Sequence, residues 1–365
     1  MAGMNQERLA RLLELMTERG WDLLFLYGHA WRKDHFRCLA NMNFSGQHAA
    51  ALVFRSGDVN GIFTDPWDTE LALDFVNGRV LVAREFGPGL AKYIPEGQKS
   101  AVAIAGMELM EARFVHAVRD AAGQMPVSAT NEVEELRRIK SAEEIACLRR
   151  AAELADRGYQ YFAQTAAAGM REYELVAEVE AFLKTNGAED NFMLIASGGV
   201  EVTGMKPPTD RKLQEGDCVI TELTPQVDGY YAQICRTLVL GEPNAAQRES
   251  FAIFAGAQKA AEDLLRPGVD IADVARVQNE VFRKFGYGEY TGPQYTRVRG
   301  HNLGLHPDEN PYVLEDVHYE VKKDMVMIAH PNTYLPLAGY MVFGDTLLVT
   351  SDGCEPLNRT ERKLF

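Results

Sequence analysis

The sequence predicts a two-domain protein of the α+β class. Its 365 residues exceed the ~100 to 200 residues of a typical single domain. The first ~130 residues alternate between helical and strand patterns, which is typical of an α/β layer with a mixed sheet. The remainder combines long helices with strands that pair through a hairpin. We therefore expect one domain over residues 1–130 and a second over residues 131–365.

The composition indicates a soluble cytoplasmic protein. Apolar residues make up 46% of the chain and charged residues 25%, as in ordinary globular proteins. The net charge of −14 disfavours a nucleic acid or an anionic membrane as a partner, because both require a basic face. The apolar runs are far shorter than the ~20 residues of a membrane span. Residues 1–20 carry charges throughout, unlike a signal peptide.

The five cysteines predict reduced thiols. They are odd in number, widely separated and form no CxxC pair: Cys38, Cys147, Cys218, Cys235 and Cys354. This pattern argues against a disulfide framework and against a zinc ribbon.

The elements of the first domain follow from the spacing of apolar residues. Gln6–Arg19 places four apolar side chains on one helical stripe, and Trp21–Tyr27 is a short buried strand. Two further strands flank a turn at residues 56–58. These two strands are Ala49–Phe54 and Gly61–Thr64. They are followed by an expected helix at Asp68–Phe75, a strand at Val80–Ala83 and a helix at Glu108–Ala121.

The second domain opens with a capping box. Ser141 can cap a helix that runs to about Ala166, and Glu144 can bond back to the cap. Further helices and strands follow in an order that favours α+β, with strands at both ends and helices between them. They are the helix Glu172–Thr185, the strands Phe192–Ala196, Cys218–Thr224 and Gln233–Val239, and the helices Asn244–Leu265 and Ile271–Lys284.

A hairpin in the second domain carries the strongest chemical signal. Glu222 and Gln233 lie inside its two strands among apolar residues. Burying a carboxylate is costly without a partner, so we expect a functional role for Glu222. The structural alternative is a salt bridge from Glu222 to Arg236.

Two further segments carry histidines. His301 lies in the segment RGHNLGLHPDENP, and His330 ends the apolar strand of MVMIAHPNTYLP. A histidine in either place, taken alone, is more often a hydrogen-bonded core residue than a catalyst.

These segments resemble the superfamily of creatinase, prolidase, aminopeptidase P and methionine aminopeptidase, which has the pita-bread fold. The sequences RRIKSAEEI, GDCVITELTPQVDGYYAQICRT, RPG at 266–268, GHNLGLHPDENP and MVMIAHPNTYLP follow the order and spacing of the family. The resemblance covers nearly the whole chain. It implies a creatinase/prolidase-type N-terminal α/β domain followed by a pita-bread catalytic domain.

The sequence departs from this family at the metal ligands. The resemblance implies two metal ions held by two Asp, one His and two Glu, and these positions are here Glu222, Gln233, His301, His330 and Gly344. Two other family histidines are replaced by Met205 and Asp308. Bridging two divalent cations needs several anionic oxygens, so a dinuclear metallopeptidase is not expected.

We expect instead a metal-independent hydrolase without a cofactor, for which the resemblance offers creatinase and ectoine hydrolase as precedents. Its substrate would be a small nitrogen-containing molecule with a cleavable C–N bond. Glu222 would act as the general base or the nucleophile. His301 and His330 would move protons to the leaving nitrogen. Gln233 and Tyr231 would fix the substrate.

Two alternatives remain open. Glu222, His301 and His330 amount to two histidines and one carboxylate, a set that suits one iron, manganese or zinc ion in an oxygenase, lyase or hydrolase. A non-catalytic binding protein on the same fold is the other alternative. The substituted positions remain polar or ionisable, with the exception of Gly344, which argues against a lost site.

The resemblance also suggests how a zwitterionic substrate would bind. Creatinase-like relatives are homodimers in which the N-terminal domain overhangs the other subunit's site, and the matching loop here is residues 31–37. Arg32 and Arg299 would clamp a substrate carboxylate. Asp308 and Glu309 would hold an ammonium or guanidinium group. Met205 replaces a histidine of creatinase at the substrate, so creatine itself is not the expected substrate.

Overall fold

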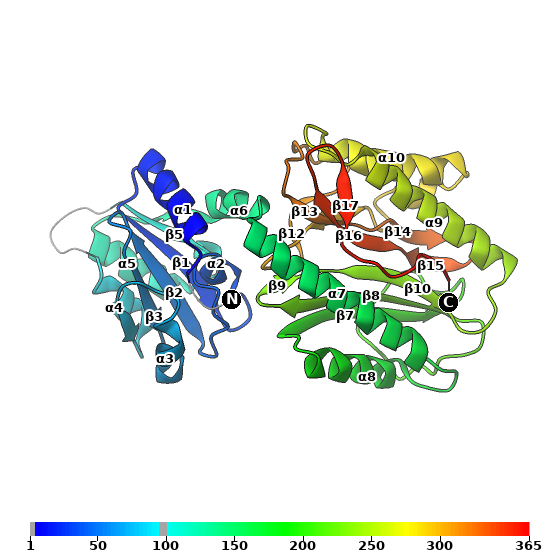
Figure 1. Ribbon diagram of the computed structural model, residues 1–365, viewed down its shortest axis with the longest axis horizontal. Coiled ribbons are helices and arrows are strands. Elements are labelled where there is room, and N and C mark those ends of the chain that lie inside the picture. The colour runs from blue at the N-terminus through cyan, green and yellow to red at the C-terminus, as the bar shows by residue number, and fades with distance from the viewer. Residues whose placement is uncertain (1–3, 95–100, 365) are drawn as a thin grey trace. The chain divides into compact units, whose positions relative to one another are not determined.

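The computed structural model describes residues 4–94 and 101–364 and divides the chain into two compact units, Met1–Arg137 and Arg138–Phe365 (Figure 1). The expected boundary at residue 130 lies at the first residue of helix α6 (Thr130–Arg138). The division between the units falls at the end of that helix.

Unit 1 contains a six-stranded mixed sheet in the order β4-β3-β2-β1-β5-β6. Strand β2 runs antiparallel to its neighbours β1 and β3, and the other pairs are parallel. The strands are β1 (Leu23–His29), β2 (His48–Phe54), β3 (Val59–Phe63), β4 (Val80–Val82), β5 (Val102–Ala105) and β6 (Val127–Ser128).

Helices cover the sheet of unit 1. Leu23, Phe25 and Tyr27 of β1 belong to one apolar core with residues of α4 and α5, because alternate side chains of a strand point to the same face. The helices are α1 (Gln6–Arg19), α2 (Asp34–Arg37), α3 (Thr69–Ala72), α4 (Phe86–Ala91) and α5 (Ala112–Ala122), with 3₁₀ turns at Pro66–Asp68 and Met107–Leu109. The helix expected from residue 108 begins only at 112, because Met110 and Glu111 are extended.

Unit 2 is built on a nine-stranded antiparallel sheet. Its main path is β12-β11-β13-β16-β10-β8-β7, with β17 beside β16 and β9 beside β8, and β14 and β15 form a separate hairpin. The strands are β7 (Asp190–Gly198), β8 (Cys218–Val227), β9 (Tyr230–Tyr231), β10 (Ile234–Val239), β11 (Gly300–Asn302), β12 (Glu309–Tyr312), β13 (Val326–Ala329), β14 (Asn332–Leu335), β15 (Gly339–Val342), β16 (Gly344–Val349) and β17 (Cys354–Pro356).

Four long helices pack on this sheet: α7 (Ala142–Thr165), α8 (Glu172–Thr185), α9 (Ala245–Leu264) and α10 (Ile271–Lys284) (Figure 1). The predicted capping box starts α7, since Ser141 and Glu144 bond to each other's backbone N–H. Helices α7 and α8 share a core with β7, β8 and β10, and α9 and α10 share one with β13 and β16. This arrangement has the α/β domain and the α+β domain that the sequence predicts.

Two sequence expectations can be compared directly with the described residues. All five cysteines are free thiols and four are buried. No helix in the described ranges combines the length and apolar character needed to cross a bilayer.

A buried ion pair joins strands β10 and β16. An Arg236 Nη2–Asp345 Oδ1 distance of 2.7 Å links side chains that are both almost fully buried. The guanidinium also donates to the carbonyl oxygen of Gly344 at 2.8 Å. Arg236 is therefore not the partner of Glu222. Cys235 pairs across the sheet with Glu222, and the next side chain, Arg236, points to the other face.

We predict that Asp345→Asn destabilises the protein by about 3 to 5 kcal/mol, because it leaves Arg236 charged and buried without its counterion. Urea denaturation measures this change. Asp263→Asn is the matched control, since its ion pair with Lys259 is exposed and should contribute less than about 1 kcal/mol. Equal losses of stability in Asp345→Asn and Asp263→Asn would contradict a special contribution of the buried ion pair.

Candidate active site

A cavity of about 540 Å³ lies in unit 2 and is lined by all three predicted catalytic residues. Six residues expected from the sequence line it: Met205, Glu222, Gln233, His301, Asp308 and His330. Because Val219 and Leu223 of β8 point toward α7 and α8, the intervening Glu222 points to the opposite face of the sheet. The cavity therefore belongs to the sheet face that the helices leave uncovered.

Cross-strand pairing sets the positions of these side chains. Glu222 pairs with Leu194 on β7 and with Cys235 on β10, and Cys235 in turn pairs with Gly344 on β16. His301 lies on β11, opposite Ile328 of β13. His330 follows β13 directly, next to the residue that pairs with Asp345. Six strands thus bring together residues more than 100 positions apart in sequence.

Glu222 is a buried carboxyl group, with 7% of its surface exposed. Burial raises the pKa of Glu222 to about 7. A hydrogen bond from the Cys235 thiol acts in the opposite direction, and the negative charge of Asp308 adds to the increase. A carboxyl group that titrates near neutral pH can both accept and return a proton during a reaction.

Gln233 is held close to this carboxyl group. Its backbone N–H donates to Thr346 Oγ1 at 2.9 Å, and the Thr346 hydroxyl donates back to the Gln233 carbonyl at 2.8 Å. The side-chain Nε2 donates to Cys235 Sγ at 3.3 Å. The amide is therefore fixed in the cavity wall and can orient a polar group of a substrate.

The two histidines form a contacting pair, with ring centroids 5.1 Å apart and an interplanar angle of 65°. Burial lowers the pKa of His301, and the nearby Asp308 carboxylate partly opposes this. Burial, together with the charges of His301 and Arg299, holds the pKa of His330 well below its usual range. Both rings are therefore neutral near pH 7.

Three predicted substrate-binding residues have other contacts. Arg299 is fully buried below the cavity and donates to Asn279 Oδ1 and to the carbonyl oxygens of Thr296 and Asn332. Arg299 is not among the residues that line the cavity, and its expected role as a carboxylate clamp stays a prediction. The Tyr231 hydroxyl donates to Asp190, and Glu309 accepts from the His306 backbone. Neither lines the cavity.

Arg32, the fourth predicted substrate contact outside the cavity lining, belongs to unit 1. Its guanidinium donates to both carboxylate oxygens of Asp34, at 3.0 and 3.3 Å. Its expected role toward a second copy of the chain stays a prediction.

Sequence reasoning missed several polar residues of the wall: Thr296, His306, Tyr312, Asn332 and Tyr340. Asn332 lies two residues after His330 in the same quoted segment and could have been found by its adjacency. Tyr340 could not, because only the β14–β15 hairpin carries it to the cavity. Burial raises the pKa of the Tyr340 hydroxyl, and the Glu222 charge raises it further.

The residues present do not fit a dinuclear metal centre. The five positions implied by the family resemblance offer only one carboxylate. Gly344 leaves no space for a fifth ligand, since a Cβ there would lie 2.5 Å from the Ala329 carbonyl oxygen and 2.6 Å from His330 Cβ. Across residues 4–94 and 101–364, no three His, Cys, Asp or Glu side chains group as metal ligands. The mononuclear alternative, with Glu222, His301 and His330 in one cavity, stays a prediction.

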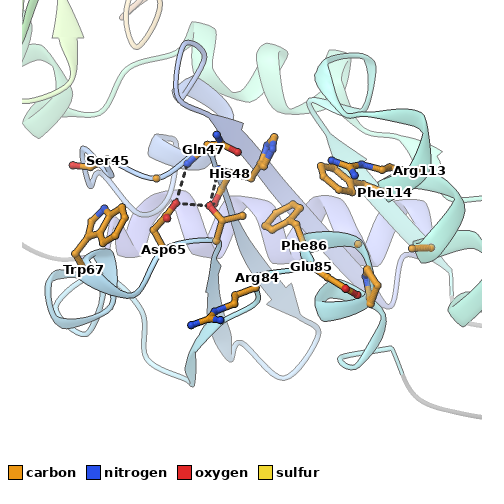
Figure 2. Close-up of a pocket in the computed structure, with 15 residues that line it drawn as sticks. Ser45, Gln47, His48, Asp65, Trp67, Arg84, Glu85, Phe86, Arg113 and Phe114 are labelled. Carbon is orange, nitrogen blue, oxygen red and sulfur yellow. Dashed lines mark hydrogen bonds between the residues drawn. The ribbon is translucent and has the colours of Figure 1, made fainter.

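A larger cavity of about 860 Å³ lies in unit 1 (Figure 2). Several of its polar groups bond to their neighbours. Asp65 accepts from the Gln47 backbone and the Thr64 hydroxyl, and His48 Nδ1 lies 2.8 Å from the Tyr27 hydroxyl. No site residue predicted from the sequence lines this cavity, so the candidate active site is the one in unit 2.

Comparisons with known proteins give a consistent family. Residues 146–351 match the model of metallopeptidase family M24. An Xaa-Pro dipeptidase of Pyrococcus furiosus is 33% identical over 235 residues, which cover 64% of this chain and 66%, just under two thirds, of that relative. A probable dipeptidase, PepE, of Mycobacterium tuberculosis is 28% identical over 98% of this chain and 92% of its own length.

A solved structure agrees with these relatives. The prolidase from Pyrococcus horikoshii superposes with a TM-score of 0.85 at 25% identity, covering 99% of this chain and 100% of that one. The expected prolidase and aminopeptidase P superfamily is confirmed. The finer resemblance to creatinase or ectoine hydrolase gains no support, since these relatives carry dipeptidase and prolidase names.

We predict that Gly344→Ala destabilises the protein by about 1 to 3 kcal/mol, because the added methyl group collides with a backbone carbonyl that cannot rotate away. Thermal denaturation measures the loss. Gly353→Ala is the control, since nothing lies within 4 Å of its Cβ, and it should change stability by less than about 0.5 kcal/mol. If Gly344→Ala left the stability unchanged, β13 and β16 would be able to move apart to accept the methyl group.

Glu222→Gln should change the pH dependence of stability. The folded-state pKa of about 7 exceeds the value of 4.5 for a free carboxyl group. Folding therefore favours the protonated form, and stability is lost as pH rises between these two values. Between pH 5 and pH 8, the free energy of unfolding of the variant should rise relative to that of wild type by on the order of 2 kcal/mol. Glu249→Gln, on the exposed side of α9, controls for the change in net charge. If the free energies of unfolding of wild type and Glu222→Gln changed in parallel with pH, the raised pKa of Glu222 would be contradicted.

Proposed function

Because this chain belongs to metallopeptidase family M24 but lacks the ligand set for two metal ions, we propose that it is a metal-independent hydrolase of a C–N bond in a small nitrogen-containing molecule. The observation that carries this proposal is the composition of the cavity wall. One buried carboxyl group faces two neutral histidines and an amide. These groups supply acid and base chemistry without a cation.

The proposed reaction starts at Glu222. Its carboxylate takes a proton from water while the water oxygen bonds to the carbon of the C–N bond. The C–N bond then breaks with its electron pair moving to nitrogen, which receives a proton through the histidines. An amide substrate would yield a carboxylic acid and an amine. Gln233 holds a polar atom of the substrate against the wall. Direct attack by Glu222 on carbon is the alternative first step.

The charges of the wall favour a substrate with a cationic nitrogen group. Glu222 and Asp308 supply negative charge, and no lysine or arginine is among the described residues of the lining. An ammonium or amidinium group would therefore be attracted to the Asp308 side of the cavity. A carboxylate on the same substrate would require a partner from outside unit 2, for which Arg32 of a second copy remains the candidate.

A second candidate function is the hydrolysis of Xaa-Pro dipeptides. The names of the Pyrococcus relatives favour it, and the bond cleaved is also a C–N bond. The ligand positions discussed above argue against the usual metal-dependent route. The two candidates differ in their response to metal ions.

The test combines metal analysis with a substrate panel. The protein is purified without a histidine tag or chelator, and its metals are quantified by mass spectrometry. Amidines, guanidino compounds, N-acylated diamines and Xaa-Pro dipeptides are then assayed with a chelator or with added Mn²⁺, Co²⁺ or Zn²⁺. We predict that a cationic member of the panel is hydrolysed and that the chelator does not reduce its turnover rate. The same rate should fall at least about 10²-fold in Glu222→Gln. Glu249→Gln is the matched control.

Three outcomes would overturn this proposal. Xaa-Pro hydrolysis that requires added metal would establish the family activity. About one bound metal per chain, lost in Glu222→Gln and His301→Gln, would favour the mononuclear enzyme. Tight binding of a panel member without turnover would favour the non-catalytic alternative.

A further inference from the structure

We infer that Arg299 and Asn332 are positioning residues that fix the tautomer of His330, and that the Asn302 carbonyl fixes the opposite tautomer of His301. His330 then presents an N–H to the cavity, and His301 presents a nitrogen lone pair to the same space. The catalytic use of this pair rests on the proposed function. The tautomers themselves follow from hydrogen-bond geometry alone.

The geometry starts at Arg299, because a guanidinium can only donate hydrogen bonds. Its Nη1 lies 2.9 Å from the Asn332 carbonyl oxygen and 3.4 Å from Asn332 Oδ1. The side-chain oxygen of Asn332 must therefore face the arginine. The amide nitrogen of Asn332 is consequently the atom that faces His330.

Asn332 in turn fixes the proton of His330. Its Nδ2 lies 3.0 Å from His330 Nδ1. An amide nitrogen donates but does not accept, so His330 Nδ1 is the acceptor and carries no proton. In a neutral imidazole the proton is then on Nε2. That nitrogen is buried and has no hydrogen-bond partner among the described residues, which leaves a donor at the cavity without an acceptor.

Arg299 is rigid enough to hold this arrangement. Its Nε donates to Asn279 Oδ1 at 2.7 Å, and Nη1 also donates to the Thr296 carbonyl at 2.7 Å. The guanidinium lies 5.5 Å from the centroid of the Phe282 ring. Contacts from α10 and from the segment before β11 therefore fix the cation in place. The same contacts explain why Arg299 is buried.

His301 carries its proton on the opposite ring nitrogen. Its Nδ1 lies 2.8 Å from the carbonyl oxygen of Asn302, which can only accept. The proton of neutral His301 is therefore on Nδ1, and Nε2 carries the lone pair. With ring centroids 5.1 Å apart, the two histidines place one donor and one acceptor beside the same cavity.

This polarity suits the proposed hydrolysis. The His330 N–H can hold an electronegative atom of the substrate, either a carbonyl oxygen or the leaving nitrogen, as a neutral imidazole donor. His301 Nε2 can receive a proton. The polarity also disfavours a metal at His330, because a protonated Nε2 has no lone pair to offer. A metal there would require the loss of the Asn332 contact.

The test reads the tautomers directly. Protein labelled with ¹⁵N-histidine is examined by long-range ¹H–¹⁵N correlation NMR near neutral pH, where the protonated and unprotonated ring nitrogens have separate shifts. The His301→Gln and His330→Gln variants assign the two signals. We expect Nδ1–H for His301 and Nε2–H for His330 in the wild-type protein.

Asn332→Asp is the matched change at the positioning residue. A carboxylate there still pairs with Arg299 but can only accept from His330 Nδ1, so His330 should switch to the Nδ1–H form. With a turned-over substrate, kcat should fall on the order of 10²-fold with a smaller change in KM. Asn244→Asp, at the N-cap of α9, should leave both tautomers and kcat unchanged.

The wild-type spectrum decides the inference even if Asn332→Asp fails to fold. An Nδ1–H signal for His330 in wild type would overturn it and would leave the proposed hydrolase standing. The expected tautomers in a protein without hydrolytic activity would instead refute the proposed function and keep the positioning role. A switched tautomer with unchanged kcat would show that the pair has no part in catalysis.

Discussion

The close approach of β16 to His330 is the constraint on which the candidate site depends. Gly344 lies so near the Ala329 carbonyl and His330 that no side chain fits there. The atoms that exclude a side chain at 344 are the Ala329 carbonyl oxygen and the Cα and Cβ of residue 330, so the backbone of this segment sets the limit. A carboxylate at 344 would have to displace the backbone of β13, and with it the sheet register that places His301 opposite Ile328. The loss of one ligand position is thus built into the packing of the strands.

Burial then decides the chemistry of what remains. A single carboxyl group on a sheet face loses its hydration and titrates near neutral pH, and the two imidazoles lose their charged forms for the same reason. Glu222 therefore binds and releases its proton near neutral pH, while both imidazoles are neutral there. Hydrogen bonds from fixed groups then orient them: Cys235 and Gln233 beside Glu222, and Asn332 beside His330. The site is accordingly defined by desolvation and by backbone-anchored donors.

Part of this could be predicted from residue patterns. The capping box at Ser141, the hairpin that carries Glu222 and Gln233, and the apolar strand before His330 are local features, and the structure has each of them at the expected residues. Other expectations depended on long-range packing. Arg299 was expected to bind a substrate carboxylate because it lies two residues before His301, but it is buried, bonds to Asn279, Thr296 and Asn332, and is not among the residues that line the cavity. Tyr340 gave no signal, because its place depends on a separate hairpin.

The sequence by itself determined the fold family, the order of the elements and the identity of the residues at the former ligand positions. These are properties of local periodicity and of motif order, which survive in the chain regardless of its folding. Only the tertiary structure decided which side chains share the cavity, which arginine is buried beneath it and which nitrogen of His330 carries the proton. Those outcomes depend on cross-strand register and on distances between segments far apart in the chain, and no local pattern encodes such distances.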